Sequence, residues 1–200
     1  GIRGFDYLCT RPEVDPGRIA VAGNSGGGTQ AAYLAGMEPR LAAMISSCYM
    51  TSYRQLWTDP GPQDAEQVFP GFLKENLDLA DWAIAAAPRP FLITSAIRDF
   101  FPIEGARSVH QELQRFWKIL GREDKAGFFE YDDTHGWSAP RRLAAYRWLE
   151  KQLLGKEGEE KEPDTEVEPE WNLWATASGQ LSLSHPGETI HSLNLSRAET

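Results

Sequence analysis

The sequence of 200 residues is long enough for one domain, or for one domain and part of another. It is 41% hydrophobic and 24% charged, which is typical of a soluble globular protein, and no apolar run approaches the roughly 20 residues of a membrane span. The formal net charge of −9 argues against a nucleic-acid-binding protein, because such proteins carry a basic face.

Apolar runs and turn residues predict an alternation of strands and helices. Short apolar runs between turns predict buried strands, and residues such as Pro88 and Gly121 mark helix ends. The predicted elements are a helix at 1–10, a strand at 18–22, a helix at 29–37, a strand at 41–49, a long loop or small cap at 50–71, a helix at 77–87, a strand at 91–97, a helix at 104–120, a strand at 128–131 and a helix at 140–154. This order indicates the α/β class, a parallel sheet with helices on both faces.

Residues 155–170 are strongly acidic. They hold eight acidic residues and two lysines, a net charge of −6 out of −9, so most of the charge belongs to a linker rather than a binding surface. Beyond them, residues 171–200 alternate between polar and apolar side chains, which predicts the start of a separate β-rich segment. We therefore divide the chain into a domain at 1–154, a linker at 155–170 and a β-rich tail at 171–200.

The two cysteines, Cys9 and Cys48, make neither a disulfide scaffold nor the spacing of a zinc site. Two thiols of the core are expected, with a single disulfide between them as the alternative. We expect no metal and no organic cofactor. The chain starts at Gly1 without a signal peptide, so its residues do not indicate a compartment, and the oligomeric state is left open.

The glycine-rich segment at 23–28 lies where a predicted strand becomes a helix, a place used by three kinds of site. A phosphate-binding loop needs a lysine and then Ser or Thr after its last glycine, but Thr29 and Gln30 follow here. A dinucleotide-binding turn needs an acid at the end of the next strand, which instead reads Ser-Ser-Cys at 46–48. The sequence therefore argues against both.

The same segment reads Gly23-Asn24-Ser25-Gly26-Gly27, the Gly-x-Ser-x-Gly pattern of a nucleophile elbow. A serine on such a strained turn needs neighbours without a Cβ atom, because larger side chains would clash. The Gly26 amide would then point at a developing oxyanion, and the dipole of the following helix would favour the negative charge. An ordinary glycine-rich turn is the alternative, since one short motif is not specific by itself.

A serine nucleophile needs a histidine base and an acid that orients the base. Asp99 comes two residues after the strand at 91–97, and His135 follows the strand at 128–131. Both lie at carboxyl ends of strands, where open α/β sheets bind ligands, and in the chain order Ser, Asp, His of the α/β-hydrolases. A turn acid and a loop histidine are the alternatives, but all three residues in this order are less expected by chance.

Other acids and histidines fit these roles less well. They are His110 within a predicted helix, His185 and His191 beyond the linker, Asp59, Asp64 and Glu66 as alternative acids in the loop at 50–71, and Asp132 and Asp133, which are too near His135 to orient it.

Four segments in chain order resemble α/β-hydrolases known as acetyl xylan esterases and related carbohydrate esterases. These segments are Val21–Thr29, Gly61–Gln67, Arg98–Phe101 and His135–Ser138. The resemblance covers residues 1–154 or so and also implies that the stretch from Gln63 to Glu66 shapes the site.

The resemblance implies the C-terminal half of an α/β-hydrolase domain with Ser25 as nucleophile, Asp99 as acid, His135 as base and the Gly26 amide as one oxyanion donor. The implied reaction removes acetyl or similar acyl groups from a small-molecule or polysaccharide ester, and the implied location is secreted or periplasmic. A prolyl-oligopeptidase-like serine peptidase shares the same core and is an alternative, as is a non-catalytic module that keeps the fold.

One feature departs from the family. An α/β-hydrolase sheet has about four strands before the nucleophile strand, and a loop among them supplies the second oxyanion donor. This sequence begins about one helix before the strand at 18–22. We therefore expect an exposed sheet edge and no activity from the 200-residue chain alone.

Overall fold

The structure is a computed structural model that describes residues 1–58, 63–158 and 161–198. The chain divides into two compact units, Gly1–Glu162 and Pro163–Thr200, which are described separately. The division falls inside the acidic segment that the sequence predicts to be a linker. Glu162 still belongs to the first unit, because its carboxylate pairs with Arg142 at 2.7 Å.

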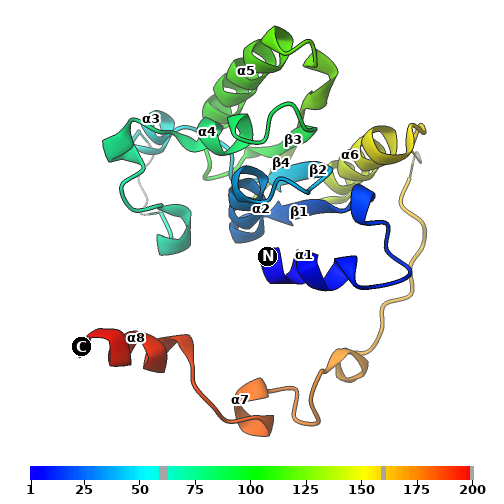
Figure 1. The fold of residues 1–200 in the computed structure, drawn as a ribbon. Coiled ribbons are helices and arrows are strands. Elements are labelled where there is room, and N and C mark those ends of the chain that lie inside the picture. Colours follow the sequence, from blue (N-terminus) through cyan, green and yellow to red (C-terminus); the bar gives the residue numbers. More distant parts are fainter. Residues whose placement is uncertain (59–62, 159–160, 199–200) are drawn as a thin grey trace. The chain divides into compact units, whose positions relative to one another are not determined.

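The first unit contains a four-stranded sheet. The strands are β1 (Ala20–Asn24), β2 (Ala43–Ser47), β3 (Phe91–Arg98) and β4 (Ala126–Thr134). Figure 1 labels the four strands among the helices of this unit. The strands pair in the order β1-β2-β3-β4, and every pair is parallel. This confirms the predicted parallel sheet, and β1 forms one edge of the sheet among the described residues.

Helices connect the strands in the predicted order. In the first unit they are α1 (Ile2–Cys9), α2 (Gly26–Met37), α3 (Tyr53–Leu56), α4 (Leu79–Ile84), α5 (Ile103–Ile119) and α6 (Ala139–Leu149), followed by a π-helical turn (Glu150–Leu154). Short 3-10 turns lie at Pro16–Arg18, Ala65–Gln67, Leu73–Glu75 and Glu123–Lys125. Among the described residues, no helix combines the length and the apolar character that crossing a bilayer requires.

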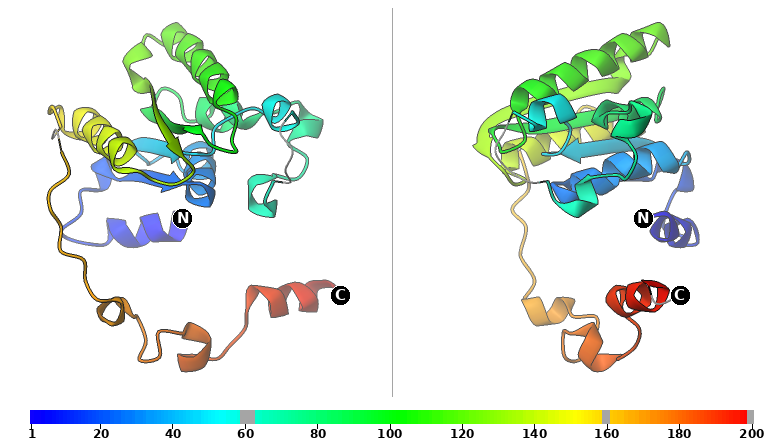
Figure 2. Two further views of the ribbon diagram at one scale, coloured as in Figure 1. Left: turned by 180° about the vertical axis from the view of Figure 1, so that it is seen from behind. Right: turned by 90° about the vertical axis from the view of Figure 1, so that its left-hand side faces the viewer.

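Alternate side chains of the strands enter two cores on opposite faces of the sheet. Met44 and Ile93 belong to the larger core, with α2, α4 and α5. Their neighbours Ile45 and Leu92 belong to the smaller core beneath α6. Because successive strand residues point to opposite faces, this division places helices on both sides of the sheet, as can be followed in Figure 2.

Within the predicted loop at 50–71, the residues that the structure describes hold one turn of α-helix, α3, and one 3-10 turn, Ala65–Gln67. Asp59 and the Gly61-Pro62 pair lie outside the described residues. Strand β4 is longer than the predicted 128–131, because the acidic residues after Tyr131 continue the ladder as far as Thr134. β4 is the other edge of the described sheet, so its polar side chains reach solvent instead of ending the strand.

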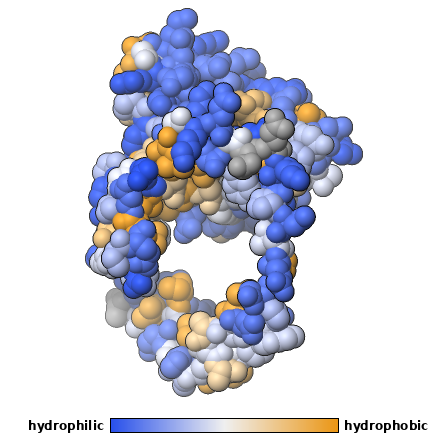
Figure 3. Space-filling model, turned by 90° about the vertical axis from the view of Figure 1, so that its right-hand side faces the viewer, coloured by the Kyte–Doolittle hydropathy of each residue, from blue (hydrophilic) through white to orange (hydrophobic). Residues whose placement is uncertain are grey.

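The predicted β-rich tail is wrong in its secondary structure. Residues 163–198 hold a 3-10 turn (Glu170–Leu173), α7 (Leu181–Ser184) and α8 (Ile190–Ala198), and no strand is assigned among them. A strand needs a neighbour for its backbone hydrogen bonds, whereas a helix satisfies its own. This unit exposes large apolar side chains, including Trp171 and Ile190, and Figure 3 shows hydrophobic surface among hydrophilic surface on it.

Candidate active site

Ser25 lies on a tight turn between β1 and α2. Its backbone has φ 57° and ψ −123°, and it is one of three non-glycine residues with positive φ in the described part of the chain. An L-residue adopts this conformation only under constraint, and such strain gathers at functional sites. The Ser25 amide donates to the carbonyl of Ser47 at 2.9 Å, which ties the turn to the end of β2.

The glycines around Ser25 are required by close backbone contacts. A Cβ atom at Gly23 would lie 2.0 Å from the carbonyl oxygen of Gly27, and one at Gly28 would lie 2.5 Å from that of Ser47. Gly26 is the first residue of α2. The first amides of a helix have no partner within the helix, so the Gly26 amide is not used by the helix ladder.

His135 and Asp99 form a direct hydrogen bond. Nδ1 of His135 lies 2.8 Å from one carboxylate oxygen of Asp99 and 3.0 Å from the other. The Asp99 side chain is wholly buried, and His135 is 26% exposed. The Phe101 amide donates to Asp99 at 3.2 Å, and the Phe100 ring packs on the imidazole with centroids 4.3 Å apart. This arrangement fixes the imidazole and leaves Nε2 for proton transfer.

The parallel sheet brings the three predicted residues to the same end of the sheet. Ser25 follows β1, Asp99 follows β3 and His135 follows β4, and the carboxyl ends of parallel strands all lie at that end. Among the hydrogen bonds of the described residues, none joins Ser25 Oγ to His135. Catalytic hydrogen bonds are often long without substrate, so the lack of this bond is compatible with His135 acting as the base for Ser25.

Asn24 links the serine turn to the histidine loop. With its amide oriented to satisfy its neighbours, the nitrogen donates to Ser47 Oγ at 2.8 Å and to the carbonyl of Gly136 at 2.7 Å. In the same orientation the Asn24 oxygen accepts from the Ser25 amide at 3.3 Å. The residue before the serine therefore contacts the residue after the histidine.

Arg141, from the first turn of α6, is a functional candidate that the sequence pattern does not reveal. Its side chain is wholly buried, and Nε donates to the Asp133 carboxylate at 3.1 Å. Nη1 donates to Ser47 Oγ at 3.1 Å and to Cys48 Sγ at 2.8 Å, while Nη2 donates to the Thr134 carbonyl at 3.3 Å. One guanidinium thus joins the ends of β2 and β4. A buried arginine needs such partners, because an unpaired buried charge is costly.

Cys48 is buried, as expected for a core thiol, but it lies in the site. Burial raises the pKa of the Cys48 thiol above its usual range, and the nearby Asp99 carboxylate raises it further. Cys48 also has a positive φ of 49°. Both Cys48 and Cys9 are free thiols, so the alternative of a disulfide between them is wrong.

Cys48, Asp99 and His135 each offer one metal-ligand atom, and these atoms lie within 4.8 Å of one another. Thiolate, carboxylate and imidazole are a ligand set that zinc accepts. However, the guanidinium of Arg141 lies 2.8 Å from Cys48 Sγ, and its positive charge opposes a cation beside that sulfur. A metal bound there would also use the Asp99 carboxylate and the His135 imidazole as ligands, and their mutual hydrogen bond would be lost.

The structure places the other candidate residues in different environments. His110 packs on Phe128, with ring centroids 5.0 Å apart, and its Nε2 lies 3.3 Å from the Ala126 carbonyl, so its role is in packing. Burial lowers the pKa of His110. His185 and His191 lie in the second unit.

The remaining acids are also accounted for. Asp132 pairs with Arg98 on the surface, and Asp64 is exposed. Glu66 is exposed, and its carboxylate would lie 3.3 Å from a Cβ atom on Gly26, so it faces the helix start beside Ser25.

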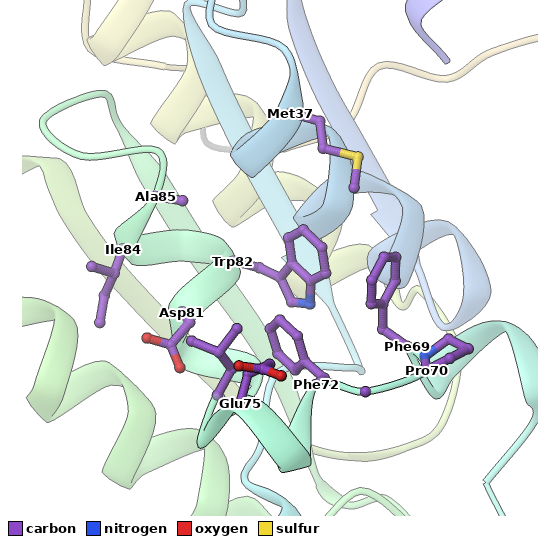
Figure 4. A pocket seen from close by; sticks show the side chains of 11 residues that line it. Met37, Phe69, Pro70, Phe72, Glu75, Asp81, Trp82, Ile84 and Ala85 are labelled. Carbon is purple, nitrogen blue, oxygen red and sulfur yellow. The ribbon is translucent and has the colours of Figure 1, made fainter.

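A separate pocket of about 730 Å³ lies at the far end of α2, between α4 and residues 69–77 (Figure 4). Its walls are mainly aromatic and aliphatic. Trp82 stacks on Phe72 with centroids 5.0 Å apart and planes 10° from parallel. None of the three predicted catalytic residues lines this pocket.

Comparisons with known proteins agree with this fold. No protein-family model matches the chain. A Bacillus subtilis (strain 168) protein named "Putative hydrolase YtaP" is 25% identical over 154 residues, which cover 76% of this chain and 52% of that protein. The chain therefore spans about half the length of this relative.

Solved structures of esterases are similar as well. A carbohydrate esterase family 15 glucuronoyl esterase from Caldicellulosiruptor kristjansonii has a TM-score of 0.66 at 19% identity, covering 86% of this chain and 54% of its own. The catalytic domain of a glucuronoyl esterase from Hypocrea jecorina has a TM-score of 0.65 at 18% identity, covering 86% and 55%. Together with the parallel sheet, these likenesses show that the chain has an α/β-hydrolase fold.

Proposed function

We propose that this protein is a serine ester hydrolase that acts on carbohydrate esters, with Ser25 as nucleophile, His135 as general base and Asp99 as the acid that orients His135. The observation that carries the proposal is the hydrogen bond between His135 Nδ1 and the buried Asp99, at 2.8 Å. This pair lies at the carboxyl end of the parallel strands, the end at which the strained Ser25 turn follows β1.

The proposed reaction has two halves. His135 Nε2 takes the proton of Ser25 Oγ as the oxygen attacks the ester carbonyl, and Gly26 N–H donates to the resulting oxyanion. The alcohol leaves with the proton held by His135, which leaves an acyl group on Ser25. Water, deprotonated by the same histidine, then releases the acid and restores the serine.

The substrate class is supported by the proteins to which the chain is similar. The two solved structures described above are glucuronoyl esterases, and the segments around Ser25, Asp99 and His135 resemble acetyl xylan esterases. Both groups act on esters of carbohydrate. We propose removal of acetyl or a similarly small acyl group, and an ester of a sugar acid is the alternative that the glucuronoyl esterases suggest.

Covalent labelling tests the proposal. A fluorophosphonate should label the full-length protein at Ser25, and Ser25→Ala should abolish the label. The matched control is Ser108→Ala, a change at an exposed serine of α5 that should keep full labelling. Label that persists on the Ser25→Ala protein would contradict the assignment.

A substrate panel then addresses the alcohol and the acyl group. We expect turnover of acetylated xylo-oligosaccharides and none of a prolyl peptide substrate. Turnover of methyl glucuronate but not of the acetyl esters would contradict the proposed acetyl group and favour an ester of a sugar acid. Turnover of the peptide alone would contradict the esterase and favour the peptidase.

A further inference from the structure

The proposed triad does not use Cys48, although the thiol lies against it. Sγ of Cys48 lies in the cluster of ligand atoms, within 4.8 Å of one another, that includes Asp99 and His135. On its other side, Arg141 Nη1 donates to the sulfur at 2.8 Å. Cys48 is therefore placed between a buried cation and the buried acid of the site.

The direction of the thiol hydrogen follows from these neighbours. The sulfur accepts from the guanidinium, so its own hydrogen must point elsewhere. Two acceptors lie near the sulfur: the Gly136 carbonyl, at 3.6 Å, and the Asp99 carboxylate, which has an oxygen within 4.8 Å of it. A carboxylate is the stronger acceptor, because hydrogen bonds to a charged partner are shorter and stronger.

The surroundings hold the sulfur in one place. The Cys48 amide donates to the Thr94 carbonyl at 2.9 Å, which anchors the strained backbone against β3. Arg141 is itself held by the Asp133 carboxylate at 3.1 Å. Since both sides of the thiol are anchored, its position relative to Asp99 is set by the fold rather than by substrate.

We propose that Cys48 is a positioning residue for the proposed hydrolase reaction. Its S–H group donates to Asp99, and Arg141 orients the sulfur from behind. The carboxylate is then held by three donors, Cys48 Sγ, the Phe101 amide and His135 Nδ1. This inference rests on the proposed function.

The experiment compares Cys48→Ala and Cys48→Val, which remove the donor, with Cys48→Ser, which keeps one. The control is Cys9→Ala, because Cys9 is also a free thiol but lies in α1 and is not part of the cluster of Cys48, Asp99 and His135. Values of kcat and KM and the pH profile of kcat/KM are measured on the full-length protein with p-nitrophenyl acetate, after circular dichroism has verified folding. Fluorophosphonate labelling of Ser25 is followed in parallel.

We expect Cys48→Ala and Cys48→Val to lower kcat by roughly 10–100-fold with KM unchanged, which is the size of loss that misplacement of a reacting group causes. The acidic limb of their pH profile should move to higher pH, because a carboxylate that has lost a donor accepts more strongly from the imidazolium. Cys48→Ser should keep the kcat and the profile of the parent protein.

A merely structural cysteine would change the melting temperature but leave the pH profile in place. The inference is overturned if the folded Ala or Val variant keeps the profile, or if Cys48→Ser loses activity as they do. If neither the Ala nor the Val variant folds, the Cys48→Ser variant decides alone. It keeps a hydrogen-bond donor, so a shifted pH profile in this variant would contradict the inference. Failure of the parent protein to label at Ser25 would instead refute the proposed function.

Discussion

The imidazole of His135 contacts both carboxylate oxygens of Asp99 through Nδ1, at 2.8 and 3.0 Å, although the two residues follow different strands. The acid side chain has no exposed surface, while the histidine is 26% exposed. A buried acid behind a partly exposed imidazole can orient the ring without meeting the substrate itself. This division of roles is what a nucleophilic hydrolase needs from the pair.

Asp99→Asn should remove most of the proposed esterase activity. The amide keeps the size of the side chain, but it no longer favours the imidazole tautomer with hydrogen on Nδ1. We expect kcat to fall by about 10⁴-fold, the order known for such a change in a serine triad. The measurement is hydrolysis of an aryl acetate by the full-length protein.

The matched control for Asp99 is Asp132→Asn. The Asp132 carboxylate is 72% exposed and pairs with Arg98 on the surface. Surface ion pairs contribute about 0–1 kcal/mol to stability, so activity and folding should stay close to those of the parent protein. Equal losses in both variants would show that Asp99 has no special role.

Ala at Gly23 should disrupt the serine turn, whereas Ala at Gly27 should not. A Cβ atom at Gly23 would lie 2.0 Å from the Gly27 carbonyl oxygen, but one at Gly27 meets nothing within 4 Å. Overpacking of this kind costs about 1–3 kcal/mol or more, and Ala is favoured over Gly inside a helix by about 0.5–1 kcal/mol. Thermal unfolding should show a lowered melting temperature only for Gly23→Ala, together with weaker fluorophosphonate labelling.

The pairing of Asp99 with His135 could be predicted because it depends on chain order alone. Both residues follow apolar runs that read as strands, and parallel strands bring their carboxyl ends to one edge. The elbow could be predicted for a similar reason, since its glycines are contiguous. For the described residues of 1–154 the structure confirms the predicted order of helices and strands, with the one-turn helix α3 as an addition inside the predicted loop.

Arg141 could not be predicted in the same way. An arginine in the first turn of a predicted helix is ordinarily exposed, and nothing next to it in the sequence shows that it turns inward. Its partners come from β2 and from the end of β4, so they meet only in the folded sheet.

The prediction of a β-rich segment at 171–200 is wrong for a different reason. Their alternation has the period of a strand, but period alone does not provide a neighbouring strand.

Trp82→Ala should destabilise the first unit strongly. Trp82 is 8% exposed, stacks on Phe72 and lies 4.6 Å, centroid to centroid, from Tyr33. Replacing a buried aromatic side chain with Ala costs about 3–5 kcal/mol through lost burial and a residual cavity. Urea unfolding measures the change. Trp57→Ala is the control, because Trp57 is 73% exposed and its removal should change the free energy of unfolding by no more than about 0.5 kcal/mol.

Glu38 should make the free energy of unfolding depend on pH in the acidic range. Hydrogen bonds from the Arg40 side chain lower the pKa of the Glu38 carboxyl from 4.5 to about 2, and the residue is only 3% exposed at the end of α2. Because the folded-state pKa is the lower one, the unfolded state binds more protons as the pH falls. The stabilisation is therefore fully present above pH 4.5 and is lost as the pH falls towards 2.

Glu38→Gln tests this contribution against pH. We expect the free energy of unfolding to fall by about 1–2 kcal/mol at pH 7, because a charge-assisted hydrogen bond is lost, and the difference from the parent protein to shrink towards pH 2. Glu13→Gln is the matched control, since Glu13 also pairs with an arginine two residues away, Arg11, but its side chain is 60% exposed. A gap that stays constant between pH 7 and pH 2 would show that the Glu38 charge is not the cause, because Gln cannot titrate.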